Sequence, residues 1–448
     1  MSRKKMDRRA FLAKSTGILA AVIAAPAVHT GSLLGGESPN EKPGAAAIGV
    51  GGRGSGIGQQ AGELGRMLAV ADVNRRHAEE FSKNYGGKCQ VFEDYRKILE
   101  RKDIDVVTCG TPDHWHTKIS ADALRSGKDL YCEKPLTLTM DESRFITGVT
   151  TKTKRIFQVG TQQRSEFDSM FLKAIAIARS GKLGTKLHAV SSVGGATSGG
   201  PFGPQKPPAE LNWDFWLGQS PKVDFTPNRI GWDFRWWYEY SGGQVTDWGV
   251  HHTDIAIWAL GGEETGAVEA EGKGQFPLGR ETTRDVLLGK KPFAGLPPSY
   301  NVASSFDCKI LFPNGNTIDL VSRDNDLTIT GEKGEIQVNR DRIAGKPYDE
   351  IQSTADGKKW LEDEVRKLYR GMPLNGHMEN FFHCVKTRQK PISDVWTHVN
   401  SVNACHMANI AMLLDRKVRF DPKKYEFPGD AEANQLMKRA QRAPYTVA

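Results

Sequence analysis

The chain of 448 residues is long enough for two domains, and its 38% hydrophobic and 25% charged residues are typical of a globular protein. Its formal charge of +8 could suggest a polyanionic partner. Residues 1–27, however, hold six basic side chains against one acidic one, so the rest of the chain keeps only +3. No basic stripe interleaved with aromatic residues is present, and the composition therefore argues against nucleic acid binding.

The first 27 residues have the pattern of a targeting segment. The pair Arg8-Arg9, followed by Phe11 and Leu12, resembles the twin-arginine export signal, and a short apolar run occupies residues 17–25. Small residues at 25–27 offer a cleavage site. We therefore expect export to the periplasm without stable membrane insertion after cleavage; a disordered basic tail is the alternative. Residues 31–44, rich in Pro, Gly and Ser, predict a linker.

The six cysteines are scattered and form no Cys-x-x-Cys pair. Two of them fall inside predicted buried strands, where small thiols commonly pack, and a protein that folds before export needs no oxidative folding. We expect free thiols and no metal site at these positions. The cysteines are Cys89, Cys109, Cys132, Cys308, Cys384 and Cys405.

Apolar runs alternate with amphipathic segments from residue 45 to residue 160. Strands are predicted near 45–50, 67–72, 104–109, 128–132 and 155–160. Helices are predicted near 56–66, 74–85, 93–101, 115–126 and 139–153. This alternation favours a parallel sheet with right-handed crossovers, that is, an α/β doubly wound domain of the Rossmann type.

The pattern changes after a helix predicted over residues 167–179. Strand-like stretches occur at 186–194, 302–311, 315–322, 326–330 and 334–338, long Gly/Pro-rich loops at 194–232 and 272–300, and helices near 377–388 and 394–415. They predict an α+β domain with a mostly antiparallel sheet. The expected organisation is signal and linker (1–43), dinucleotide-binding domain (44–163), and substrate and oligomerisation domain (164–448).

A glycine-rich turn lies between the first predicted strand and the first helix. Gly49, Gly51 and Gly54 form the G-x-G-x-x-G spacing, which allows a tight turn, close approach of the backbone to a pyrophosphate and a helix N-terminus aimed at it. Asp72 ends the second strand, where a carboxylate accepts hydrogen bonds from ribose hydroxyls and repels a 2′-phosphate. NAD is therefore favoured over NADP, although Arg75 and Arg76 could recruit a ribose phosphate.

Two further motifs carry candidate chemistry. Glu133-Lys134-Pro135 closes the strand near 128–132, so the Lys134 amine should point into the crevice at the strand ends. A glycine-led segment then places Asp247 and His251 four residues apart, on one face of a predicted helix. A surface ion pair on that helix is the alternative interpretation.

With these three motifs in this order, residues 44–420 resemble the Gfo/Idh/MocA family of nicotinamide-dependent sugar and polyol dehydrogenases. The resemblance implies a lysine beside the nicotinamide, an Asp-x-x-x-His pair in the active site, and a Thr-Pro-Asn-x-x-His loop against the dinucleotide. Asp113 stands here where asparagine is common, and His116 is expected to contact the cofactor or support the loop. A dimer or tetramer built through the second-domain sheet is also implied. The expected cofactor-binding residues are Gly49, Gly51, Gly52, Arg53, Gly54, Asp72, Thr111, Pro112, Asp113, His116, Glu133 and Lys134.

Carried over, the catalytic residues are Lys134, Asp247 and His251. An imidazole titrates near neutrality and can take a hydroxyl proton, whereas a buried lysine beside an oxidised nicotinamide can polarise the hydroxyl. We assign His251 as the base and Lys134 as the polarising group; the reverse assignment stays open.

Seven of the ten tryptophans lie between residues 213 and 258, which favours a sugar with a flat C–H face over a small aliphatic acid. Trp258, on the helix after His251, is expected to be core. The substrate-contacting candidates are Arg235, Tyr240, Trp248 and His252.

The predicted function is oxidation of a sugar or glycoside hydroxyl, with an NAD that is retained and recycled in place because free NAD is scarce outside the cytoplasm. A redox-neutral glycoside hydrolase or lyase, working through a transient keto-sugar, is the alternative. A cofactor-binding protein without catalysis is the third class.

Overall fold

The computed structural model describes residues 42–293 and 295–447. The predicted export signal and nearly all of the linker therefore lie outside the described residues. Within those two ranges, no helix is both long enough and apolar enough to cross a lipid bilayer.

The first sheet has six parallel strands in the order β3-β2-β1-β4-β5-β6. This is the order of a Rossmann domain, in which the strand order reverses between β1 and β4. The three alanines of β1 and their neighbours are fully buried, as expected for a strand covered on both faces. The strands are β1 (Gly44–Ile48), β2 (Arg66–Ala71), β3 (Gln90–Phe92), β4 (Val106–Cys109), β5 (Asp129–Glu133) and β6 (Phe157–Gly160).

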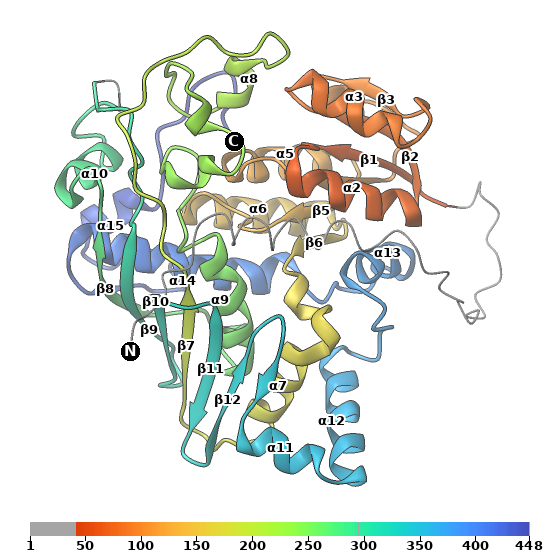
Figure 1. Ribbon diagram of the computed structural model, residues 1–448, viewed down its shortest axis with the longest axis vertical. Coiled ribbons are helices and arrows are strands. Elements are labelled where there is room, and N and C mark those ends of the chain that lie inside the picture. Colours follow the sequence, from red (N-terminus) through yellow and green to blue (C-terminus); the bar gives the residue numbers. More distant parts are fainter. Residues whose placement is uncertain (1–41, 294, 448) are drawn as a thin grey trace, which may run out of the picture. The chain divides into compact units, whose positions relative to one another are not determined.

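Crossover helices connect these strands (Figure 1). Asn74 and Thr139 cap two of them, because their side-chain oxygens accept hydrogen bonds from the backbone amides of Arg76 and Glu142. The helices are α2 (Gly52–Leu64), α3 (Arg75–Lys83), α4 (Arg96–Leu99), α5 (Asp113–Arg125) and α6 (Met140–Thr153).

The second sheet has eight strands in the order β13-β12-β11-β7-β10-β9-β8-β14, all paired antiparallel except β7 with β10. In β9, Phe306, Cys308 and Ile310 are buried while Asp307 and Lys309 are exposed, which is the alternation of a strand with one buried face. The strands are β7 (Leu187–Val193), β8 (Glu269–Gln275), β9 (Ser305–Leu311), β10 (Thr317–Ser322), β11 (Asp326–Gly331), β12 (Gly334–Val338), β13 (Ile343–Ala344) and β14 (Val418–Arg419).

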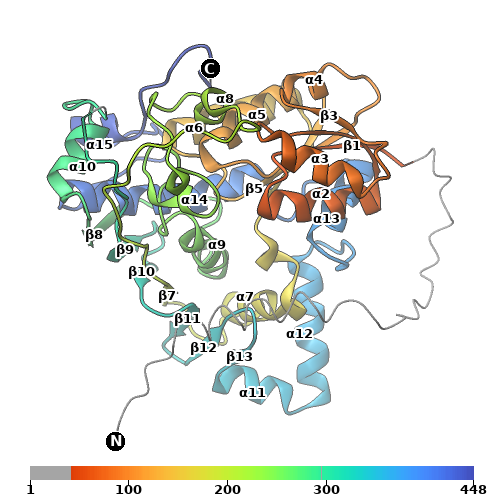
Figure 2. The same ribbon diagram turned by 45° about the horizontal axis from the view of Figure 1, so that its top comes forward.

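Helices α7 (Met170–Arg179), α9 (Trp248–Ala259) and α14 (Val395–Leu414) pack on this sheet. Figure 1 shows the row of strands in front of α9 and α14, and Figure 2 shows α7 lying beside α12. Trp258 is buried in this core, as predicted. The remaining helices are α8 (Trp213–Leu217), α10 (Arg280–Leu287), α11 (Lys346–Gln352), α12 (Ala355–Leu368), α13 (His377–Thr387) and α15 (Ala431–Leu436), with short 3-10 turns at Gln162–Arg164, Phe167–Ser169, Pro227–Arg229 and Asp233–Trp236.

The predicted fold class, a Rossmann-type sheet followed by a domain with a mostly antiparallel sheet, is confirmed. The region 272–300, predicted as loop, instead contains the end of β8 and helix α10, and β3, α11 and α12 were not predicted at all. All six cysteines are buried free thiols.

Candidate active site

A cavity of about 940 Å³ lies at the carboxyl ends of β1, β2, β4 and β5. Its other wall comes from residues 166–167, 208–216 and 230–235, from the start of α9 and from the turn after β12. Both domains therefore contribute side chains to one cavity. In open parallel sheets, ligands bind at this place, just outside the carboxyl ends of the strands.

The glycine turn at the start of α2 needs its glycines. Gly49 has a φ of +72°, and a Cβ there would lie 2.5 Å from Cγ2 of Thr111. A Cβ on Gly54 would overlap the carbonyl oxygen of Gly49, so α2 can pack this closely against the turn only with glycine. Gly51 and Gly52 line the cavity directly. The turn thus offers an exposed backbone and a helix N-terminus to a pyrophosphate.

Asp72 lies on the cavity wall at the end of β2. Its carboxylate accepts hydrogen bonds from the backbone amides of Val50 and Asn74, both at 2.8 Å. These bonds fix the carboxylate beside the glycine turn, and each oxygen keeps a lone pair for a ribose hydroxyl. The nearby Asp72 carboxylate raises the pKa of His77, whose Nδ1 lies 3.7 Å from Oδ2. The residues of the first domain therefore fit a dinucleotide.

The loop from Thr111 to His116 forms the next part of the wall, and Thr111, Pro112, Asp113 and His116 all reach the cavity. Burial raises the pKa of Asp113 to about 7, against the attraction of Arg235. Nδ1 of His116 lies 2.7 Å from the carbonyl oxygen of Pro135, and Nε2 lies 2.8 Å from that of Thr111. His116 thereby ties this loop to the loop that carries Lys134.

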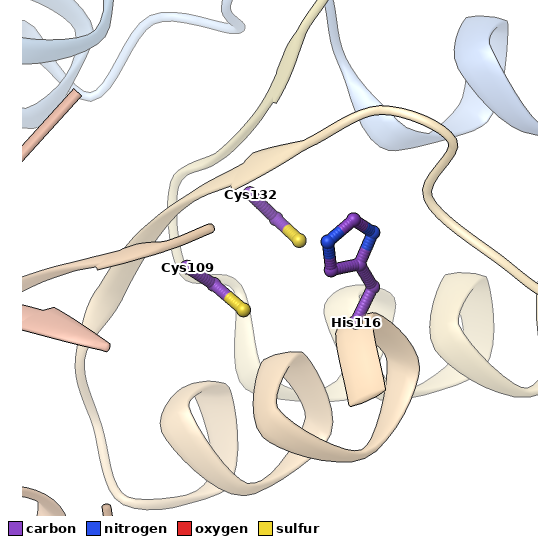
Figure 3. A group of neighbouring side chains, drawn as sticks. All are labelled: Cys109, His116 and Cys132. Atoms are coloured by element: carbon purple, nitrogen blue, oxygen red, sulfur yellow. The ribbon is translucent and has the colours of Figure 1, made fainter. Parts of the chain in front are cut away.

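His116 also approaches two thiols at the ends of neighbouring strands (Figure 3). Cys109 in β4 and Cys132 in β5 are in register, and one ring nitrogen of His116 and the two sulfur atoms all lie within 4.8 Å of one another. Among the described residues this is the one His/Cys group close enough to share a metal ion. Each ring nitrogen, however, already lies at hydrogen-bond distance from a carbonyl oxygen, so neither is free to bind a metal.

Lys134 meets Asp247 across the cavity. Nζ of Lys134, just beyond β5, lies 2.5 Å from Oδ1 and 3.1 Å from the backbone oxygen of Asp247, the residue before α9. Nε of Arg235 lies 2.9 Å from Oδ2 of Asp247. The Nε–H bond does not point at that oxygen, so the contact is an ion pair without a hydrogen bond. Burial disfavours ionisation of Asp247, but Lys134 and Arg235 outweigh burial and hold the pKa of Asp247 below its usual value.

His251 lies on α9, one turn after Asp247, and lines the same cavity. Its ring is 5% exposed, and its Nδ1 has no hydrogen-bond partner among the described residues. Burial, together with the charges of Lys134 and Arg340, holds the pKa of His251 well below its usual value. The imidazole is therefore neutral at physiological pH and can accept a proton.

Glu133 connects the glycine turn at the start of α2 to the segment after β6. Its Oε1 lies 3.0 Å from Nε of Arg53, in the glycine turn, and accepts a hydrogen bond of 2.9 Å from Gln162. Arg53 and Glu133 both line the cavity.

Of the four predicted substrate residues, Arg235 and Trp248 line the cavity, whereas Tyr240 and His252 do not. The Tyr240 hydroxyl accepts a hydrogen bond from Arg229, and Nε2 of His252 lies 2.7 Å from Oδ1 of Asn325, so both side chains are engaged in the core. Cavity residues that the sequence did not reveal are Gln162, Glu166, Phe167 and Arg340. None belongs to a recognisable motif; only their position after predicted strands could have drawn attention to them.

Fold and cavity define a two-domain protein with a dinucleotide site of the Rossmann type. Residues 44–161 match the family model "Oxidoreductase family, NAD-binding Rossmann fold", and residues 196–279 and 340–447 match "Oxidoreductase family, C-terminal alpha/beta domain". Together the two models cover well over half of the chain, and the chain belongs to the Gfo/Idh/MocA oxidoreductase family.

Characterised relatives match only in part. The chain is 27% identical to the scyllo-inositol 2-dehydrogenase (NAD(+)) of Bacillus subtilis over 200 residues, which are 45% of this chain and 48% of that protein. It spans less than half the length of the first curated relatives that it matches.

Solved structures agree with the fold over most of the chain. The aldose-aldose oxidoreductase of Caulobacter crescentus, crystallised with glycerol, has a TM-score of 0.58 at 18% identity and covers 85% of this chain and 100% of its own. GenD2 from gentamicin A biosynthesis, crystallised with NAD, has a TM-score of 0.57 at 16% identity and covers 87% of this chain and 100% of its own. At these identities the likeness concerns the fold.

Proposed function

We propose that the protein is an NAD-dependent oxidoreductase that acts on a secondary hydroxyl of a sugar or polyol. The observation that carries the proposal is the meeting of Lys134, Asp247 and a neutral His251 in the same cavity as the glycine turn and Asp72. When bound, NAD supplies the hydride-accepting group.

The side chains have distinct roles in this proposal. Lys134 donates a hydrogen bond to the reacting hydroxyl and favours its negatively charged form as the proton leaves. His251 accepts that proton, because its ring is neutral and lines the cavity. Asp247 fixes the ammonium group of Lys134 and balances its charge.

The choice of NAD over NADP follows from Asp72 and from its neighbours. Nε of Arg75 lies 2.7 Å from Glu79, and Nε of Arg76 lies 3.7 Å from Glu80, so each nearby guanidinium already has a carboxylate beside it on α3. These ion pairs are exposed and weak, but each places a carboxylate beside the arginine. With the Asp72 carboxylate also nearby, this region attracts a 2′-phosphate only weakly.

A sugar substrate is supported by the wall opposite the glycine turn. Trp216, Trp232 and Trp248 line it, and Trp232 is 58% exposed. The Arg235 guanidinium carbon lies 4.2 Å from the centroid of a Trp232 ring. An open indole beside fixed polar groups suits a ring with one apolar face and several hydroxyls.

We also propose that residues 1–27 direct export of the folded protein, and that NAD is bound before export and recycled in place. This proposal rests on the Arg8-Arg9 pair, which precedes a short apolar run. Recycling then needs either a second carbonyl compound as acceptor or a reaction with no net redox change.

Substitution of the proposed catalytic residues tests the activity. His251→Asn and Lys134→Met should lower turnover by about 10²–10⁴-fold, the usual contribution of general acid–base catalysis, while NAD released on denaturation stays unchanged. His188→Asn, on the distant strand β7, is the matched control and should keep full turnover. A loss below about tenfold in His251→Asn would move the base elsewhere.

The absorbance of bound nicotinamide during mixing with sugars, polyols and glycosides separates the reaction types. An oxidoreductase without a second acceptor should accumulate one equivalent of reduced cofactor per site and then stall. Steady release of free sugar without net change in the cofactor would instead identify the redox-neutral glycosidase.

A further inference from the structure

Arg340 is a cavity residue that the catalytic scheme does not use. It lies in the turn between β12 and β13 and lines the same cavity as Trp248 and His251. Its guanidinium carbon lies 4.5 Å from a Trp248 ring centroid and 4.8 Å from that of Phe167. Two aromatic contacts hold the planar group in place without using its N–H donors.

Arg340 has no anionic partner within the described residues. It forms no ion pair or side-chain hydrogen bond there, and its buried Nε has no hydrogen-bond partner. The neighbouring guanidinium groups differ in this respect: Arg53 is paired with Glu133, and Arg235 with Asp247. Arg340 is only partly buried and lines the cavity, so the terminal N–H groups of its fixed guanidinium can donate to an acceptor on a ligand.

The charges around Arg340 point the same way. Asp247 already faces two cations, Lys134 and Arg235, and the Glu133 carboxylate already faces Arg53. Glu166 attracts Arg340 but lies beyond ion-pair distance, and burial raises its pKa. Glu133 and Asp247 also attract Arg340, but each is already paired with another cation, so Arg340 has no carboxylate of its own.

We propose that Arg340 binds a carboxylate on the substrate, so that the site takes an acidic sugar in preference to the neutral one. This proposal rests on the proposed function above. The planar N–H fork of arginine fits the two oxygens of a carboxylate. A phosphate dianion would call for a second cation, and Arg53, Lys134 and Arg235 each have a carboxylate partner already.

Calorimetric titration of the NAD-loaded protein with matched sugars tests the proposal. The probes are D-glucuronate, D-galacturonate and D-mannuronate, each compared with its neutral aldose and its 6-phosphate. Loss of a charged hydrogen bond costs about 10- to 100-fold in affinity, so the best uronate should bind at least about tenfold more tightly than its aldose. Arg340→Gln should abolish this preference and Arg340→Lys should restore part of it.

Arg342→Gln is the matched control, since Arg342 is an exposed residue two positions along the same turn, where it contacts Gln337. It should keep the preference for the uronate. Equal or weaker binding of all uronates than of their aldoses would overturn the proposal, and so would tighter binding of a 6-phosphate than of the uronate. Loss of retained NAD in Arg340→Gln would also overturn it, because Arg340 would then serve the cofactor.

These outcomes are separate from those that test the proposed function. Neutral sugars that reduce the bound cofactor without any uronate preference would refute the role of Arg340 and leave the oxidoreductase intact. Uronate binding that depends on Arg340, but with no reduction of the bound cofactor by any probe, would support Arg340 and contradict the proposed reaction.

Discussion

At the scale of single residues, Asp72 decides the cofactor preference that we propose. It is held by two backbone amides beside the glycine turn, so a dinucleotide bound at that turn would meet its negative charge. Asp72→Ala should weaken NAD binding and reduce the ratio of the affinity for NAD to that for NADP. Titration of each dinucleotide into protein freed of bound cofactor measures both affinities. Asp103→Ala, which removes an exposed carboxylate paired with Arg101, is the control. Wild-type protein that prefers NADP would contradict the assignment.

Residues in recognisable motifs could be predicted, and residues without one could not. Asp72 and Lys134 follow strands, and Asp247 precedes a helix, that the sequence pattern located, so their meeting in one cavity followed from the fold. Tyr240 and His252 were expected there because of their neighbours in sequence, but the direction in which a side chain points depends on local backbone geometry. Arg340 reaches the cavity through a sheet register that no local pattern encodes.

At the scale of secondary structure, α2 shows how one helix combines a binding turn with a packing requirement. Gly54→Ala should destabilise the protein and reduce retained NAD, because the added methyl overlaps the Gly49 carbonyl oxygen and pushes α2 away. Gly56→Ala, one half-turn further on, meets nothing within 4 Å and should raise the free energy of unfolding by about 0.4–1 kcal/mol. Urea unfolding and released NAD measure both effects. Equal stability in the two variants would contradict the packing argument.

The elements that sequence patterns missed share a physical reason. α11 and α12 bury only Ile351, Leu361 and Val365 among many charged residues, so no apolar run marks them in the sequence. β3 has three residues, none of them fully buried, and β8 contains two glycines and several charged residues. The long buried strands and the capped helix α14 were predicted to within a few residues, because continuous burial leaves a clear apolar run.

At the scale of the whole molecule, buried histidines should make the protein acid-sensitive. Burial lowers the pKa of six of them, so that the unfolded chain takes up protons between about pH 6.5 and pH 4 while the folded chain does not. Stability is therefore complete above pH 6.5 and is lost as the pH falls through this window, by about 1.4 kcal/mol per pH unit for each net proton. Burial raises the pKa of Asp113 and of Glu142 to about 7. These two carboxyl groups make the folded state more stable at low pH, but they are fewer than the histidines. The histidines are His114, His251, His252, His377, His398 and His406.

Urea unfolding at about pH 7.5 and about pH 5 measures this loss. His398 has no hydrogen-bond partner on either ring nitrogen among the described residues, so His398→Leu should reduce the difference between the two pH values. The same change at the partly exposed His188 is the control. A free energy of unfolding that does not fall toward pH 5 would contradict the prediction.

Export can be tested on the full chain. Replacement of Arg8 and Arg9 by lysine should leave the protein in the cytoplasm, because twin-arginine transport recognises the paired guanidinium groups. Replacement of Arg3 and Lys4 by glutamine, outside the pair, is the control. An unchanged periplasmic yield of the Arg8, Arg9 variant would count against the export proposal.

The pair formed by Lys134 and Asp247 joins the two domains, since one residue follows a strand of the first sheet and the other begins a helix packed on the second. In the mechanism that we propose, the reaction therefore needs side chains of both domains at once. The glycine turn and Lys134 belong to the first domain, whereas the counter-charge of Lys134 comes from the second, so neither domain alone holds the proposed catalytic pair.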